Sequence, residues 1–135
     1  MKKKYVACAL LVKNNKLLLQ DRKGISKYWE EWSFFGWWLD EWESSREALL
    51  REIKEELEFD ISNWDIKYLW EIVHYIEDFN IEYHRYLYLI NIPNNINIFN
   101  DKEWSWAHFF DLDNINNLKF NTPVKAEVFQ LKNNI

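Results

Sequence analysis

The chain contains very little glycine and cysteine. It has 2 glycines among 135 residues, whereas the usual share of about 7% would give roughly nine. The single cysteine, Cys8, excludes an internal disulfide and any zinc site built from several cysteines. Cys8 lies in an apolar run, so a buried position in a strand is favoured over a role as a nucleophile.

Long basic tracts and long apolar runs are also missing. Lysines gather at residues 2–4, and the net charge is −5. Binding of long nucleic acid normally depends on a basic patch and is therefore disfavoured. Small anionic ligands stay open, because a metal ion can supply positive charge. The apolar run after the lysines is about eight residues long, which is too short to span a membrane, and we interpret it as a strand instead of a signal peptide. We expect a cytoplasmic protein with no membrane partner.

Tryptophan is abundant, with 9 residues. Three of them, Trp37, Trp38 and Trp42, lie in or beside a segment that we expect to be a loop. Two explanations are open. In the first, the protein is a tryptophan-rich variant. In the second, some UGA codons read here as tryptophan encode glycine in the source organism. The abundance of Asn, Ile and Lys indicates an AT-rich gene and is consistent with the second explanation. The codons at positions 37, 38 and 42 decide between them.

The hydrophobic pattern predicts one α/β domain over residues 1–135. Strands are expected at residues 5–12, 16–20, 32–35, 66–76, 81–92 and 106–110, with a hairpin turn at 13–15. Helices are expected at residues 44–57 and after Thr122, where Pro123 takes the first helical position. The long apolar runs of the strands at 66–76 and 81–92 indicate that both faces are covered. A mixed sheet between helices, an α/β/α sandwich, is the expected architecture.

The helix at residues 44–57 has clear signals at its start and along one face. Ser44 is a good N-cap, and Glu47 three residues later completes a capping box. Leu49, Ile53 and Leu57 recur at every fourth residue and form an apolar stripe. This helix is therefore expected to pack against the rest of the domain.

Three carboxylates share another face of the same helix. Glu52, Glu55 and Glu56 follow the i, i+3, i+4 spacing. Like charges at this spacing destabilise a helix by a few tenths of a kcal/mol per pair unless something offsets them. A hard divalent cation such as Mg²⁺, which prefers carboxylate oxygens, would be a strong offset. A plain solvated helix face is the alternative.

The surrounding residues carry a family resemblance. Glu43, followed after seven residues by Arg51-Glu52-Ile53-Lys54-Glu55-Glu56, resembles the Nudix box, G-x5-E-x7-R-E-U-x-E-E-x-G-U, in which U is a bulky aliphatic or aromatic residue. All charged positions match, as do both hydrophobic ones. The two glycines of the formula are replaced, by Trp37 and by Glu58. The resemblance also extends to the general layout of the chain, where it is less specific.

The resemblance implies a hydrolase that cleaves a pyrophosphate bond in a nucleoside diphosphate derivative with Mg²⁺ or Mn²⁺. It implies that Glu55 and Glu56 are the principal metal ligands and that Glu52 is a further ligand or helps to activate the water. The backbone carbonyl of Gly36 would approach the metal from the loop. The site would thus hold a small-molecule nucleotide and a divalent cation.

The resemblance assigns the remaining charged residues of the box to a structural task. Arg51 would pair with Glu43 and lock the loop against the helix, which we favour over direct contact with the substrate. Many family members recruit an additional acidic base from another loop, and Asp101 and Glu103 are the candidates here, with a polar surface loop as the alternative. Nudix-like domains are often homodimers, so a homodimer is one of the oligomeric states that the resemblance allows.

Two other functional classes remain in view. A non-catalytic nucleotide-binding module on the same fold would explain why Trp37 and Trp42 crowd a loop that must approach phosphate closely. At a position with positive φ, a tryptophan would cost about 1–2 kcal/mol. A structural interaction protein is the third class, suggested by the surplus of aromatic residues. The three histidines show no metal-ligand spacing and are expected to be ordinary.

Overall fold

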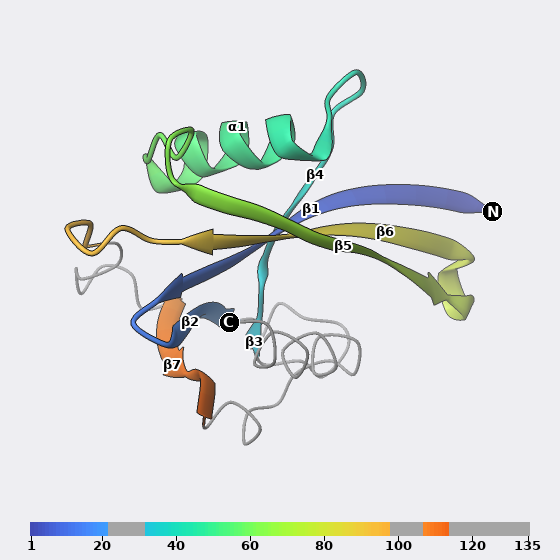
Figure 1. Cartoon of the computed structure of the whole chain (residues 1–135). Helices are drawn as coiled ribbons and strands as arrows, with labels where there is room; N and C mark the ends of the chain where they lie inside the picture. The colour runs from blue at the N-terminus through green and yellow to red at the C-terminus, as the bar shows by residue number, and fades with distance from the viewer. Residues whose placement is uncertain (22–31, 98–106, 114–135) are drawn as a thin grey trace. The chain divides into compact units, whose positions relative to one another are not determined.

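The computed structural model describes residues 1–21, 32–97 and 107–113 (Figure 1). The chain divides into two compact units, one formed by Met1–Leu10 and Gly36–Ile92 and the other by Leu11–Phe35 and Pro93–Ile135. The elements are β1 (Lys2–Lys13), β2 (Lys16–Asp21), β3 (Trp32–Ser33), β4 (Phe35–Trp38), α1 (Ser45–Leu57), β5 (Asp65–Ile76), the 3₁₀ turn η1 (Glu77–Phe79), β6 (Ile81–Asn91) and β7 (Ala107–Asp111). The expected single domain over residues 1–135 stays a prediction.

The second unit contains the hairpin between the end of β1 and β2. Asn14 and Asn15 have φ of 52° and 60°, which is the left-handed conformation that a two-residue hairpin turn requires. Val12 lies opposite Leu17 across this turn. Strand β2 also pairs antiparallel with β7, from Lys16 opposite Asp111 onward. The hairpin predicted at residues 13–15 is confirmed, and the apolar side chains of β2 are fully buried.

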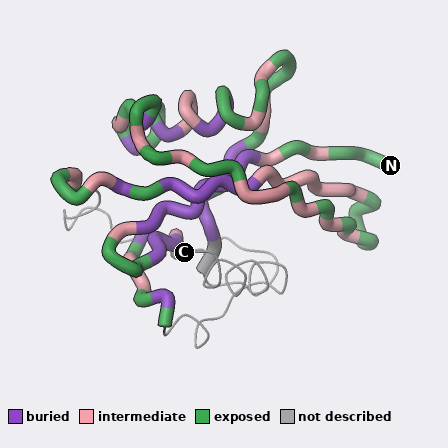
Figure 2. Tube along the Cα trace, in the orientation of Figure 1, coloured by how far each residue is buried: buried purple, intermediate pink, exposed green. Residues whose placement is uncertain are grey.

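The first unit combines α1 with a hairpin of two long strands. β5 and β6 pair antiparallel along their whole length around η1, where Asn80 takes a left-handed φ of 51°. β1 pairs with β6 and with β4. Helix α1 lies along one side of these strands (Figure 1), and its buried residues face them (Figure 2). This packing fixes how α1 is turned and hence where its polar face lies.

Two local expectations were wrong. The strand predicted at residues 32–35 is two short strands, and β4 continues through Gly36 and Trp37 to Trp38, because backbone pairing with β1 extends into the segment taken for a loop. Strand β5 is not covered on both faces. Tyr68 and Val73 are 49% and 54% exposed, so its long apolar run belongs to a partly open strand.

The α/β class that the sequence indicates is confirmed. In the first unit, the core is made of apolar side chains from β1, α1 and β6, namely Ala7, Ala9, Leu10, Ala48, Leu49, Ile53, Leu57, Leu87, Leu89 and Ile90. The C-terminal helix predicted after Thr122 lies outside the described residues. Within residues 1–21, 32–97 and 107–113, no helix has both the length and the apolar character needed to cross a membrane.

Candidate active site

The helix that carries the acidic residues begins at a complete capping box. The Ser44 side chain accepts a hydrogen bond from the Glu47 backbone N–H at 3.1 Å, and the Glu47 carboxylate accepts one from the Ser44 backbone N–H at 3.3 Å. These two bonds satisfy backbone donors that the first turn of a helix leaves without partners. The start of α1 is therefore set by local sequence, as predicted.

Tertiary packing sets the rotation of α1 about its axis. Ala48, Leu49 and Ile53 have no exposed surface, and Leu57 is almost fully buried. Burying an aliphatic side chain of this size stabilises a fold by about 1.5–3 kcal/mol, so this face is firmly held. The carboxylates at the i, i+3, i+4 spacing consequently project from a different face.

Arg51 is the centre of the polar network on that face. Its Nε and Nη2 donate to the two oxygens of Glu43 at 2.6 and 2.9 Å. Nη1 donates to Glu52 at 2.9 Å and to Glu55 at 3.3 Å, and Nη2 also lies 3.3 Å from Asp40. One guanidinium thus contacts four carboxylates and joins the loop before α1 to the helix. The Arg51–Glu43 pairing implied by the box is present.

The bidentate contact shifts the titration of both partners. Hydrogen bonding to Arg51 lowers the pKa of Glu43 to about 2, because it favours the ionised carboxylate. The same hydrogen bond to Glu43 raises the pKa of Arg51 above its already high ordinary value. Glu43 side-chain exposure is 12% against 30% for Arg51, so the pair is partly shielded from water. Asp40 was not anticipated as a partner. Its position three residues before Glu43 was the available signal.

Glu56 has a partner that the sequence did not reveal. The indole Nε1–H of Trp37 donates to Glu56 Oε2 at 2.7 Å. Trp37 lies in β4 and is buried, with 8% exposure. It occupies the first glycine position of the box, yet its backbone does not have positive φ. The crowding expected from a tryptophan at this position is therefore not backbone strain. The Trp37 side chain is accommodated in the core and reaches the acidic face of α1, which is formed by Glu52, Glu55 and Glu56.

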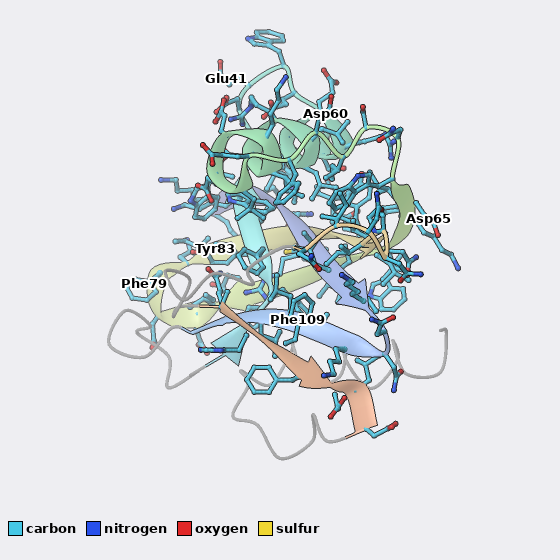
Figure 3. The ribbon with its side chains drawn as sticks, turned by 90° about the vertical axis from the view of Figure 1, so that its left-hand side faces the viewer. Glu41, Asp60, Asp65, Phe79, Tyr83 and Phe109 are labelled. Atoms are coloured by element: carbon cyan, nitrogen blue, oxygen red, sulfur yellow. The ribbon has the colours of Figure 1, made fainter. Side chains whose placement is uncertain are left out.

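The other two departures near the box do fall in glycine-like conformations. Trp42, in the loop before α1, has φ of 72°, and its side chain is 97% exposed. Glu58 caps the C-terminus of α1 with φ of 61° and ψ of 31°, which is the left-handed cap that glycine usually supplies. Glu41, in the same loop as Trp42, is labelled in Figure 3. Trp42 and Glu58 therefore both carry side chains at positions where the backbone conformation favours glycine.

Gly36 packs tightly against β1. A Cβ added to Gly36 would lie 3.3 Å from Val6 Cγ1 and 3.5 Å from Cys8 Sγ. The first of these distances is tighter than ordinary van der Waals contact, so a side chain here would require Val6 to shift. Gly36 thus allows β4 and β1 to lie close together, immediately before Trp37. Its role toward a metal stays a prediction.

The chemistry of the acidic face suits a hard cation, because its donors are carboxylate oxygens. Within the described ranges, no three acidic, histidine or cysteine side chains are placed to hold one ion together. These carboxylates have protein partners. Glu52 and Glu55 each accept a hydrogen bond from Arg51 through one oxygen, and Glu56 accepts one from Trp37. Each carboxylate retains a second oxygen, and the Glu55 side chain is 60% exposed and can turn.

Asp101 and Glu103, the candidate additional bases, lie outside the described residues.

Of the histidines, His84 has a specific environment that the sequence did not suggest. Its Nδ1 lies 2.7 Å from Glu71 and its Nε2 2.6 Å from Glu82. Hydrogen bonding to Glu71, and then to Glu82, raises the pKa of His84, whereas burial lowers the pKa of His74. The cross-strand register of β5 and β6 explains the His84 cluster.

Comparisons with known proteins place this geometry in a family. The chain resembles the structure of Escherichia coli dihydroneopterin triphosphate pyrophosphohydrolase, with a TM-score of 0.74 at 14% identity over 100% of both chains. It also resembles a MutT NUDIX hydrolase from Burkholderia pseudomallei, with a TM-score of 0.72 at 18% identity over 96% of this chain and 98% of that one. The NUDIX domain of Shewanella oneidensis NrtR, complexed with ADP ribose, gives a TM-score of 0.73 at 16% identity over 99% of this chain and 89% of that one.

At these identities the structural likeness establishes the fold. Comparison with curated proteins gives no match. The family model described as NUDIX domain matches residues 1–131, which is nearly the whole chain. The chain therefore belongs to the NUDIX domain family, and the Nudix hydrolase assignment that the box predicts is confirmed.

Proposed function

We propose that this Nudix hydrolase cleaves a pyrophosphate bond in a nucleoside diphosphate derivative with the help of Mg²⁺ or Mn²⁺. The observation that carries the proposal is the charge balance on α1 and its preceding loop. Asp40, Glu43, Glu52 and Glu55 all contact one guanidinium, that of Arg51, so negative charge is in large surplus. A surplus of carboxylates on a firmly packed helix suits a divalent cation and, through it, a phosphate ligand.

The proposed roles follow from the contacts. Glu55 and Glu56 are the principal ligands, since their carboxylates are on the exposed part of the acidic face, and Glu52 is a further ligand or orients the attacking water. The Gly36 carbonyl, in β4, would be a further ligand to the same ion. A divalent cation, when bound, neutralises phosphate charge and lowers the pKa of an attacking water.

Arg51 and Glu43 act by positioning. Their bidentate contact ties the loop before α1 to the helix, so that the loop and the acidic face keep a fixed relation. Phosphoryl and nucleotidyl transfer depend mainly on positioning and on neutralising charge. The Arg51 network supplies the first of these requirements without itself touching the substrate. Asp101 and Glu103 remain the proposed sources of an additional base.

The test is a Mg²⁺-dependent hydrolysis assay over deoxynucleoside triphosphates, oxidised dGTP, dinucleoside polyphosphates and nucleotide sugars. Turnover of at least one substrate is expected. Glu55→Gln combined with Glu56→Gln should reduce kcat by about 100-fold or more, as expected when groups that stabilise transition-state charge are lost. Glu41→Gln, which removes a carboxylate from the adjacent loop, is the control and should retain activity. Undiminished activity in the double variant would overturn the proposal.

A second candidate is a nucleotide-binding module without turnover. Trp42 favours it, because a bulky side chain at a left-handed position stands in the loop that must approach phosphate. The NUDIX domain of NrtR, solved as a complex with ADP ribose, is a structural neighbour with a bound ligand. Isothermal titration separates the two functions. Nucleotide binding that needs no Mg²⁺ and leads to no product would support the module and would count against the hydrolase.

A further inference from the structure

We infer that Trp37 is a positioning residue for Glu56, which it holds through the indole N–H so that one carboxylate oxygen is presented to the cation. This inference rests on the proposed metal-dependent function. It concerns the residue that stands where the Nudix box has its first glycine. The tryptophan that replaces this glycine would then contribute to the metal site by orienting Glu56 and would not impair it.

Each nitrogen of the Arg51 guanidinium already contacts a carboxylate other than that of Glu56. Nε donates a hydrogen bond to Glu43. Nη2 donates to Glu43 and forms an ion pair with Asp40, and Nη1 donates to Glu52 and Glu55. A guanidinium has five N–H donors in a fixed plane, and each nitrogen is already committed to these neighbours. Glu56 therefore needs another donor if its carboxylate is to be held in one orientation.

Trp37 supplies such a donor from a buried position in a paired strand. The indole has one N–H and accepts no hydrogen bond, and it lies 2.7 Å from Glu56 Oε2. The Trp37 side chain is buried, and its strand, β4, pairs with β1. A donor fixed in the core limits the rotamers of an exposed glutamate that would otherwise lose conformational freedom on binding a ligand.

The hydrogen-bond donors of the three glutamates also differ in charge. Glu52 and Glu55 share the positive charge of Arg51, which reduces their attraction for a cation. The indole N–H is neutral, so it orients Glu56 without cancelling the negative charge. With Oε2 on the indole, Oε1 of Glu56 is the oxygen left for the cation. Glu56 should therefore contribute more to cation affinity than Glu55 does.

The test compares Trp37→Phe, which keeps a buried ring and removes the N–H, with the neighbouring Trp38→Phe. Trp38 is 52% exposed and lies near Lys4 and Tyr83. Mn²⁺ affinity is measured by electron paramagnetic resonance, without substrate. Loss of a hydrogen bond that preorganises the ligand is expected to weaken Mn²⁺ binding about 5-fold in Trp37→Phe, and Trp38→Phe should match the wild type. Unchanged or tighter Mn²⁺ binding in folded Trp37→Phe would overturn the inference.

A second measurement serves if Trp37→Phe does not fold. In ¹⁵N-labelled Glu56→Gln, which keeps every tryptophan, the indole N–H resonance of Trp37 should move upfield as its charged acceptor becomes an amide. In the wild type, the same resonance should shift on addition of Mg²⁺. An indole signal indifferent to both changes contradicts the inference. If wild-type protein binds no Mn²⁺ at all, the proposed metal-dependent function fails instead, so the two failures are distinguishable.

Discussion

Replacing Trp42 by glycine should stabilise the protein, whereas replacing it by alanine should not. Trp42 has φ of 72° and its side chain is 97% exposed, so removing the indole forfeits almost no buried surface. The left-handed conformation costs a residue with a Cβ about 1–2 kcal/mol. Glycine escapes this cost but loses about 0.5–1 kcal/mol more chain entropy on folding than alanine does. The balance favours Trp42→Gly over Trp42→Ala by about 1 kcal/mol.

Urea unfolding followed by far-ultraviolet circular dichroism measures this difference. A gain of about 1 kcal/mol should raise the midpoint at unchanged m-value and raise Tm by roughly 3–6 °C for a domain of this size. Trp38 provides a matched control, because it lies in β4 without positive φ. There the order should reverse, and Trp38→Ala should be more stable than Trp38→Gly. Equal or greater stability of Trp42→Ala would show that residue 42 is not left-handed.

Three further predictions concern the Arg51 network, the histidines of β5 and β6, and the start of α1. Glu43→Gln should cost about 1–2 kcal/mol, since a charged hydrogen bond is lost from a partly exposed pair. Because the folded-state pKa of Glu43 is lowered from 4.5 to about 2, its contribution is present above pH 4.5 and is lost as the pH falls toward 2. Acid titration of stability should therefore be shallower in Glu43→Gln, and an identical profile would contradict this. His84 should titrate above 6.5 and His74 below it by NMR. The contribution of His84 to stability is therefore present below pH 6.5 and is lost as the pH rises through its folded-state pKa. The reverse order of midpoints would refute the role of Glu71. Ser44→Ala should cost about 1 kcal/mol in urea unfolding through loss of the helix cap, and a cost below about 0.3 kcal/mol would show that the cap bond adds little.

The sequence was most informative where local interactions decide the structure. The capping box of α1 and its apolar stripe depend on residues within a few positions of one another, and both appear as predicted. The same holds for the turn at Asn14 and Asn15, where asparagine tolerates positive φ. From the helix period alone, the three carboxylates could be assigned to one face. These features need no knowledge of the tertiary fold.

Contacts between distant segments could not be anticipated in the same way. The Trp37–Glu56 bond joins residues 19 positions apart, and no periodicity signals which buried indole will face which glutamate. Strand β4 runs past its predicted end because pairing with β1, a tertiary contact, overrides the loop-like composition. The open face of β5 was missed for a related reason, since apolar runs do not distinguish a covered strand from one that leaves tyrosines exposed.

The unusual tryptophans of the box region do not form one class. Trp42 has the backbone of a glycine and a side chain in solvent, so a UGA codon recoded as glycine would suit position 42. Trp37 has an extended backbone, a buried ring and an N–H bonded to Glu56, and glycine there would leave a cavity and a glutamate without its donor. We therefore expect tryptophan at position 37 in protein isolated from the source organism, which peptide mass spectrometry can establish. Glycine at position 37 would remove the basis for its positioning role and return Glu56 to an unrestrained helix face.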